Sequence, residues 1–321
     1  MLLRAAVMAC VLLAVVAVLT GCTAAAPVPS GGSAPAPSAP SAPSAPSAPP
    51  APSASSSPGG VTKVLVIVVE NHSFDQMRAQ MPYTFGLATT FGYATRYTAI
   101  RHPSLPNYVA LVGGQTYGIA DDGGPSANAI RSGMSVFGQA IAAGRTAALF
   151  AEGMPGNCAL ANGGDRYVVK HNPWAYFAAE RSLCTRFDVP IENLAATIAT
   201  GTLPTVGMVV PNLCNDAHDC PLGTADAWIR GWMEKLFAGP DWASGHLAVL
   251  ITADENDDSP GNTVLTVVVH PSQAAHVVAT PLSHYSVTRL LEDVAGAPHL
   301  FGAASAPSLS TAFALPIGAA H

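Results

Sequence analysis

The sequence has no run of basic residues, no Cys-x-x-Cys pair and no internal repeat of fixed period. The absence of a basic tract argues against nucleic acid as a partner. Without a Cys-x-x-Cys pair, a four-cysteine zinc site is disfavoured. Positive charge is also scarce, since 14 Lys and Arg against 20 Asp and Glu give a net charge of −6 at pH 7. An anionic substrate would therefore need local help from a metal or from a few Arg and Lys side chains.

A hydrophobic run long enough to span a bilayer is missing from the N-terminus, because Met8–Val18 is too short. This run follows the single positive charge of Arg4 and precedes Leu19-Thr20-Gly21-Cys22, which is typical of a bacterial lipobox. We therefore predict a lipoprotein signal peptide over residues 1–21 and acylation of Cys22, with palmitate as an expected lipid. The lipid would anchor the protein to the extracytoplasmic face of the cell membrane, from which the domain could also be shed. An uncleaved transmembrane anchor is the less favoured alternative.

Residues 24–60 contain no charge and no large apolar side chain beyond Val28, and they repeat Ser-Ala-Pro. Such a composition cannot bury a core, so we predict a disordered tether over residues 22–60. In the polyproline II form, at about 3.1 Å per residue, it would reach on the order of 100 Å. Residues 61–321 are enough for one domain with a sizeable core.

Cysteine usage fits an oxidising compartment. Cys10 leaves with the signal peptide and Cys22 is the predicted lipid site. The four that remain are Cys158, Cys184, Cys214 and Cys220. An even number of cysteines suggests two disulfides, for which three pairings exist. We favour Cys158–Cys184 and Cys214–Cys220, because a short-range bridge would clamp the acidic loop between the last two cysteines.

Apolar, β-branched runs alternate with helical segments along the domain. The predicted strands are Val64–Val69, Ala94–Ile100, Thr146–Ala151, Thr205–Val210, Leu247–Ala253 and Thr263–Val269. The predicted helices are Leu105–Val112, Val136–Ala143, Ile191–Ala199, Thr224–Phe237 and His284–Val294. Continuous apolarity indicates strands buried on both faces. We therefore predict a three-layer α/β fold with a mostly parallel sheet and helices on both faces.

Polar residues follow four of these strands. Glu70-Asn71, His102–Ser104, Asn212–Asp219 and Asp254-Glu255 each come directly after a predicted strand or close to its end. In a parallel sheet the carboxyl ends of the strands meet at one edge, where open α/β folds place their sites. These groups are therefore expected to come together there.

Ser104 is the best candidate nucleophile in this set. It lies between a predicted strand and a predicted helix, where its hydroxyl and the neighbouring N–H groups would face an anion. Serine also caps helices well, which is the competing interpretation. The flanking His102 and Asn107, together with the carboxylates at the other strand ends, favour catalysis.

The acidic residues predict a divalent cation of unknown identity, since carboxylate oxygens are hard ligands. The candidate ligands are Glu70, Asn71, Asp216, His218, Asp219, Asp254, Glu255 and His284. A core or helix-capping role for His284 is about equally favoured, and Asp257 and Asp258 are expected to be solvated or to lie behind the ligands. The candidate residues for binding substrate phosphate are His102, Asn107, Lys170 and His171. A surface turn before Pro173 is an equally favoured interpretation of Lys170 and His171.

Five segments, in this order, resemble the motifs of the bacterial phosphoesterase family: Glu70–Asp75, His102–Tyr108, Pro211–Asp219, Asp254-Glu255 and His284–Ser286. That family includes acid phosphatases and phospholipases C and has the alkaline-phosphatase-like fold. Within it the chain is most similar to the small secreted acid phosphatases of mycobacteria. The resemblance identifies residues 61–321 as a phosphoesterase domain. It implies a Ser104 nucleophile and places Asp254 and Glu255 in a metal site.

The residues and the resemblance together predict hydrolysis of phosphomonoesters at the cell surface, through a phosphoserine intermediate and with the help of a divalent metal. The expected substrate is a phosphorylated small molecule or a phospholipid headgroup. A phosphodiesterase or phospholipase C is the alternative within the enzyme class. A lipoprotein that binds phosphate or metal without turnover is the alternative outside it.

Overall fold

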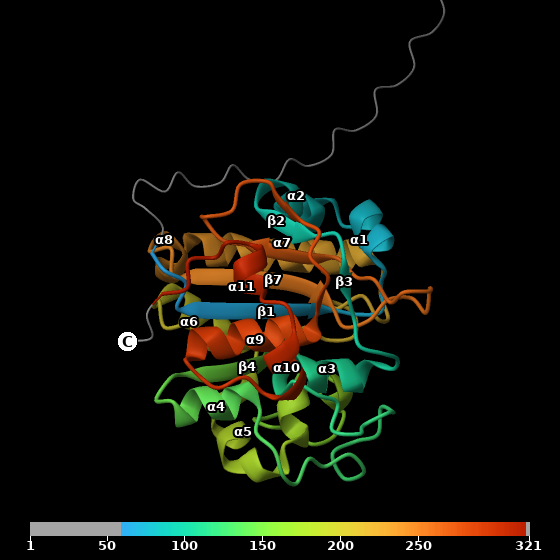
Figure 1. Cartoon of the computed structure of the whole chain (residues 1–321). Coiled ribbons are helices and arrows are strands. Elements are labelled where there is room, and N and C mark those ends of the chain that lie inside the picture. The colour runs from blue at the N-terminus through green and yellow to red at the C-terminus, as the bar shows by residue number, and fades with distance from the viewer. Residues whose placement is uncertain (1–58, 319–321) are drawn as a thin grey trace, which may run out of the picture. The chain divides into compact units, whose positions relative to one another are not determined.

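The computed structural model describes residues 59–318 (Figure 1). The predicted signal peptide, the lipidation site and residues 22–58 of the predicted tether lie outside the described residues. Within residues 59–318, no helix combines the length and the apolarity that crossing a bilayer requires.

An eight-stranded sheet with the order β5-β4-β6-β1-β7-β8-β2-β9 forms the centre of the fold. Its strands are β1 (Lys63–Val69), β2 (Gly92–Ala94), β4 (Ala147–Ala151), β5 (Asp188–Pro190), β6 (Val206–Val210), β7 (Leu247–Ala253), β8 (Thr266–Val269) and β9 (His276–Val278). The strands from β5 to β7 are all parallel, and β8 runs antiparallel to both of its neighbours. Because β1, β6 and β7 are almost wholly buried and apolar, both faces of the sheet need a cover.

Helices provide that cover. α3 (Ser104–Gly113), α4 (Val136–Ala142) and α9 (His284–Ala295) pack together on one face, and Figure 1 shows α9 in front of the sheet, just below β1. α6 (Glu192–Ala199), α7 (Leu222–Ala238) and α8 (Pro240–Ala243) pack together on the other face. The remaining helices are α1 (Phe74–Gln80), α2 (Pro82–Thr90), α5 (Arg181–Phe187), α10 (Phe301–Ser305) and α11 (Leu309–Ala312), with 3-10 turns η1 (Val169–His171), η2 (Pro173–Tyr176) and η3 (Ala178–Glu180). The predicted three-layer, mostly parallel α/β fold is confirmed.

One predicted strand, Ala94–Ile100, is wrong as a single element. Its first part belongs to β2 in the large sheet, whereas β3 (Tyr97–Thr98) pairs in parallel with β10 (Leu282–Ser283) in a separate two-stranded sheet. The chain changes partner at Thr95 and Arg96: Thr95 N–H donates to Val278 O, and Arg96 O accepts from Leu282 N–H. Local apolarity cannot show this change, because both halves are equally suited to a strand.

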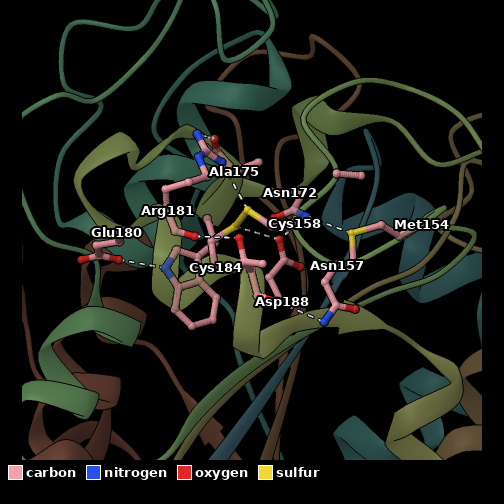
Figure 2. Close-up of a disulfide and its surroundings, with 12 residues drawn as sticks. Met154, Asn157, Cys158, Asn172, Ala175, Glu180, Arg181, Cys184 and Asp188 are labelled. Carbon is pink, nitrogen blue, oxygen red and sulfur yellow. Dashed lines mark hydrogen bonds between the residues drawn. A yellow bond between two sulfur atoms is a disulfide. The ribbon is translucent and has the colours of Figure 1, made fainter.

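Both favoured disulfides are present in the structure, Cys158–Cys184 and Cys214–Cys220. The first ties the segment after β4 to α5, and Figure 2 shows it among buried polar side chains. The second closes the loop that carries Asp216. A cross-link in such loops stabilises the fold chiefly by restricting the unfolded chain.

Asp188, at the start of β5, is a buried carboxyl beside the first disulfide (Figure 2). It accepts a hydrogen bond of 2.8 Å from Asn172 Nδ2. Burial raises the pKa of Asp188 to about 8, although Asn172 and Arg181 act to lower it. An unfolded Asp titrates near pH 4. Because the folded state binds this proton more tightly, the stability that Asp188 contributes is greatest at low pH and falls as the pH rises from about 4 to about 8.

We expect Asp188→Asn, which cannot ionise, to raise the free energy of unfolding relative to the wild type by a margin that grows with pH in that window. Urea denaturation at pH 5, 6, 7 and 8 measures the margin. Asp165→Asn, which changes an exposed Asp whose side chain has no ion-pair partner in residues 59–318, is the control and should give a flat difference. A margin that shrinks toward pH 8 would contradict the raised pKa.

Candidate active site

The carboxyl ends of β1, β6 and β7 bring three acidic segments to one edge of the sheet. Glu70 follows β1 directly, Asp254 follows β7 directly, and Asp216 comes from the loop after β6. Two backbone hydrogen bonds hold the ends together: Glu70 N–H donates to Asp216 O at 2.8 Å, and Asp254 N–H donates to Val69 O at 3.0 Å. All three carboxylates are fully buried, so the sheet itself concentrates negative charge in its interior.

Ser104 is the first residue of α3 and is 1% exposed. Its hydroxyl donates to Glu70 Oε2 at 3.2 Å and approaches Glu255 Oε1 at 3.4 Å. The N-cap of α3 is Pro103, and no side chain caps the helix there. The capping interpretation of Ser104 is therefore not what the structure shows, because its hydroxyl faces the carboxylates rather than the helix N–H groups.

Asn71, Asp254 and Glu255 form the second part of the cluster. Asn71 N–H donates to Asp254 Oδ1 at 3.2 Å, and Asn71 Nδ2 donates to Glu255 Oε1 at 2.9 Å. Asn71 has a φ of 41°, in the left-handed region that asparagine adopts more readily than most residues. This backbone turn, directly after β1, directs the Asn71 side chain toward the residues that follow β7.

His171 lies on the other side of Glu70 and is buried. Its Nε2 is 3.2 Å from Glu70 Oε2, and its Nδ1 is 3.3 Å from Asp216 Oδ2. The ring of Tyr108 stacks on His171 with 5.1 Å between centroids, and the Tyr108 hydroxyl donates to Glu70 Oε1. The structure therefore places His171 among the carboxylates, deeper than the phosphate-binding position that we predicted.

Burial and mutual repulsion dominate the electrostatics of the cluster. Burial, Glu70 and Glu255 raise the pKa of Asp254 well above its usual value. Burial and Glu70 also raise the pKa of Glu255 to about 8. Against the effect of burial, His171 holds the pKa of Glu70 below its usual value, and Glu70 and Asp216 raise the pKa of His171 to about 9. A bound divalent cation would relieve this repulsion.

These residues fit a divalent cation. Glu70, His171 and Asp216 offer ligand atoms within 4.8 Å of one another. Two buried oxygens of the cluster, Asn71 Oδ1 and Asp254 Oδ2, have no hydrogen-bond partner. Asp216 Oδ2 and both ring nitrogens of His171 also make no hydrogen bond, because their contacts of 3.2 and 3.3 Å are ion-pair distances without hydrogen-bond geometry. Buried polar atoms normally have partners, so unsatisfied atoms that converge on one place indicate a ligand. Oxygen donors with one imidazole suit a hard or borderline metal.

Two predicted site residues instead support the site from behind. His284 Nδ1 contacts the Tyr97 hydroxyl at 2.8 Å and its Nε2 contacts the main-chain oxygen of Asp254, so neither nitrogen faces the carboxylates. The prediction of His284 as a metal ligand is corrected to one of positioning Asp254.

Asn107 uses its Oδ1 to accept from the N–H groups of Ile100 and Arg101, and its Nδ2 donates to Glu255 Oε2 at 3.0 Å. Its amide is therefore occupied in shaping the segment before Ser104.

The structure places His218 and Asp219 on the exposed side of the cluster, where the His218 ring lies 6.0 Å from the ring of His171, measured between centroids. Both are exposed, and His218 Nδ1 pairs with Asp219 Oδ1 at 2.8 Å on the surface of the loop. Only Asp216 of this acidic loop points inward, where its Oδ1 accepts from His218 N–H at 2.7 Å. Asp219 therefore lies outside the buried part of the cluster, in the loop that the Cys214–Cys220 bridge closes.

His102 and Lys170 lie at the rim. His102 is partly exposed, with its Nδ1 3.0 Å from Glu255 Oε2, and it remains a candidate for substrate binding. Lys170 Nζ is 3.2 Å from Asp122 Oδ2, with a side chain 20% exposed. Although burial acts to lower it, the carboxylates Glu70 and Asp122 raise the pKa of Lys170 above its usual value, so a cation is held beside the site.

Two residues of the site were missed by the sequence analysis. Tyr108 lies four residues after Ser104, a spacing that puts both side chains on one side of α3, so the sequence did contain a signal. Asp122 accepts from Leu105 N–H at 3.0 Å and pairs with Lys170. It lies in a glycine-rich turn that follows no strand, and only the tertiary structure brings it to the start of α3.

Comparison with known sequences finds relatives over most of the chain. The model of the Phosphoesterase family matches residues 77–298. The phosphatidylinositol-3-phosphatase of Mycobacterium tuberculosis is 30% identical over 250 residues, which cover 77% of this chain and 81% of that protein. The phosphate-repressible acid phosphatase of Penicillium chrysogenum is 30% identical over 220 residues, which cover 64% of this chain and 52% of that protein. The chain thus spans about half the length of this fungal relative.

Solved structures share the fold. A lipoteichoic acid synthase from Listeria monocytogenes aligns with a TM-score of 0.53 at 9% identity, covering 76% of this chain and 75% of that one. A phosphonate monoester hydrolase from Silicibacter pomeroyi aligns with a TM-score of 0.51 at 11% identity, covering 78% and 76%. At such identities the likeness concerns the fold alone, and it agrees with the predicted three-layer α/β architecture.

Proposed function

Because this chain belongs to the Phosphoesterase family, we propose that it hydrolyses phosphomonoesters with Ser104 as the nucleophile and a divalent cation among the buried carboxylates. Membership confirms the resemblance inferred from the five motifs, and the phosphatase relatives confirm the enzyme class, a phosphoric monoester hydrolase. The residue roles, the covalent intermediate and the cation are our proposal.

One observation carries the proposal: a buried serine hydroxyl points at two carboxylates from the first residue of a helix. Ser104 Oγ lies within 3.4 Å of a carboxylate oxygen of Glu70 and of Glu255, so either carboxylate can accept its single O–H hydrogen bond. A serine that only capped α3 would direct its oxygen to an N–H group instead. A binding protein for phosphate or metal would have no need of a serine in this place.

In the proposed reaction, Ser104 Oγ gives its proton to one of these carboxylates and attacks phosphorus in line. The P–O bond to the alcohol breaks as the Ser104–phosphate bond forms, and the alcohol leaves with a proton. Water then attacks the phosphoserine and restores the serine hydroxyl and inorganic phosphate. His102 and Lys170 lie where they can hold phosphoryl oxygens. When bound, a divalent cation supplies Lewis-acid stabilisation of the phosphoryl charge. The residues that would hold this cation are Glu70, Asn71, Asp216, Asp254, Glu255 and His171.

The test is hydrolysis of p-nitrophenyl phosphate by the purified chain from pH 4 to 9, beside p-nitrophenyl phosphorylcholine as a diester. Acid quench and peptide mapping then locate any phosphoserine. Monoester turnover with phosphate on Ser104 supports the proposal. Faster diester turnover would favour the phosphodiesterase or phospholipase C alternative, and stoichiometric binding without product would favour the binding lipoprotein.

We propose phosphoinositides as one substrate class. The support is the mycobacterial relative, which is named for phosphatidylinositol 3-phosphate and shares 81% of its length with this chain. Phosphate release from short-chain phosphatidylinositol 3-phosphate, compared with glycerol 3-phosphate at equal concentration, measures the preference. Equal kcat/KM for the two would contradict it.

We also propose that the enzyme is a lipoprotein on the extracytoplasmic face of the cell membrane. The support is the sequence Leu19-Thr20-Gly21-Cys22 and the uncharged tether behind it. Cys22→Ser should move the protein from the membrane fraction to the soluble fraction and abolish labelling by a palmitate analogue. Unchanged fractionation would contradict the lipid anchor.

Asp122 gives a prediction for substrate affinity. Asp122→Asn keeps an acceptor for Leu105 N–H but removes the charge that pairs with Lys170. We expect kcat/KM to fall about tenfold, mainly through KM, because Lys170 is no longer held beside the phosphate. Asp121→Asn changes the exposed neighbour and should leave the kinetics unchanged. Steady-state kinetics of both variants decide the matter, and equal effects would contradict a specific role for Asp122.

A further inference from the structure

A cavity lies beside the amino end of β4, whereas the candidate active site lies at the carboxyl ends of the strands. It has a volume of about 330 Å³ and opens between the amino end of β4, the start of β5 and α6. Thr146 and Ala147 line it where β4 begins, and Pro204 lines it just before β6. None of the proposed catalytic or metal-binding residues contributes to its wall. Its volume is within the range of sites for small organic ligands.

The charge of this cavity comes from two arginines, Arg145 and Arg186. Within residues 59–318 neither side chain forms an ion pair with a carboxylate, and no Asp or Glu lines the cavity. The Nε of Arg145 is buried and has no hydrogen-bond partner. An unsatisfied buried guanidinium N–H is unusual, and an anion is the group that guanidinium binds best.

The other polar side chains of the wall already have partners within the protein. Thr146 Oγ1 accepts from Thr205 N–H at 2.9 Å, Thr197 Oγ1 donates to Asn193 O at 2.7 Å, and Asn193 Nδ2 donates to Pro190 O at 3.0 Å. The two arginines are therefore the charged donors that the wall offers to a ligand. A ligand here needs an anionic group and few other polar atoms.

The rest of the wall is apolar. Phe150, Phe187, Val189 and Ile141 line the cavity, and the guanidinium of Arg186 lies 4.9 Å from the centroid of the Phe187 ring. Phe187, Val189 and Ile141 are only partly buried, so a ligand would remove their apolar surface from water. We propose that this cavity binds a small amphiphilic anion, with its charged group on Arg145 and Arg186 and its apolar body against Phe150, Phe187 and Val189.

The test uses two probes of this chemistry on the purified full chain, 8-anilinonaphthalene-1-sulfonate by fluorescence and decanoate by its displacement. We expect saturable binding at one site, which decanoate competes for and neutral decanol does not. The double variant Arg145→Gln/Arg186→Gln should weaken binding about tenfold or more, because charge-assisted hydrogen bonds are lost. Arg78→Gln, which changes an exposed arginine on α1, is the matched control and should bind as the wild type does.

A second variant, Ala148→Phe, keeps both arginines but fills the cavity from β4, and it should abolish binding. Thermal unfolding of each variant reports whether it is folded. If the double variant is not folded, the single variant Arg186→Gln is tested in its place. Binding unchanged within twofold in the arginine and Ala148 variants would overturn the proposal. So would equal competition by decanol and decanoate, or the absence of saturable binding.

Discussion

Replacing Ser104 by alanine is expected to lower kcat for phosphomonoesters by at least about 10³-fold, since the group that forms the covalent bond to phosphorus is lost. This corresponds to about 4 kcal/mol of activation free energy. The free energy of unfolding should change by no more than about 3 kcal/mol, the contribution of a hydrogen bond to a charged group, so the variant should remain folded. Steady-state kinetics and urea denaturation of the same preparation measure both quantities.

The matched control is Ser308→Ala, which removes a serine that does cap a helix. Ser308 Oγ accepts from Thr311 N–H at 3.1 Å at the start of α11, far along the chain from the cluster. This variant should lose about 1 kcal/mol of stability and keep its kcat. Near-normal turnover of Ser104→Ala would rule out Ser104 as the nucleophile, and a similar loss of kcat in Ser308→Ala would show that the effect is not specific to Ser104.

The second large effect is expected for Asp254→Asn, together with removal of divalent cations. Asp254 is buried next to Glu70 and Glu255, and its Oδ2 has no hydrogen-bond partner. Replacing this carboxylate by a neutral amide removes the negative charge with which it would hold a cation, so kcat should fall by about 10²-fold or more. Chelation of the wild type should have a similar effect, reversed by adding back the metal.

Thermal unfolding separates cation binding from catalysis. A cation that binds only the folded state raises the stability of the wild type by RT ln(1 + [L]/Kd), about 2.7 kcal/mol at a hundredfold excess over Kd. Asp254→Asn should show little of this gain, and in chelator it should be more stable than the wild type because carboxylate repulsion is reduced. Asp257→Asn, in the same acidic run but exposed, should keep the full gain. Equal gains in both variants would remove Asp254 from the metal site.

Much of the fold could be predicted because a buried strand or helix shows a recognisable hydrophobic pattern in its local sequence. β1 and β7 are buried on both faces, and each is a continuous apolar run that ends in a carboxylate. Helix α9 shows its buried stripe through Val287, Leu290 and Leu291. The hydrophobic pattern gave a wrong prediction for residues 94–100, because two neighbouring segments suited to strands join different sheets.

The sequence alone determined the layers of the fold, the edge at which the polar strand ends meet and the serine that lies there. These depend on hydrophobic periodicity and on the order of strands and helices, which are local properties. The tertiary structure decided which polar side chains face the interior. Asp216 turns inward while Asp219 stays at the surface, His284 supports Asp254 from behind, and Asp122 arrives from a distant turn. A side chain's direction depends on backbone dihedrals and on neighbours far along the chain, and residue type alone does not record either.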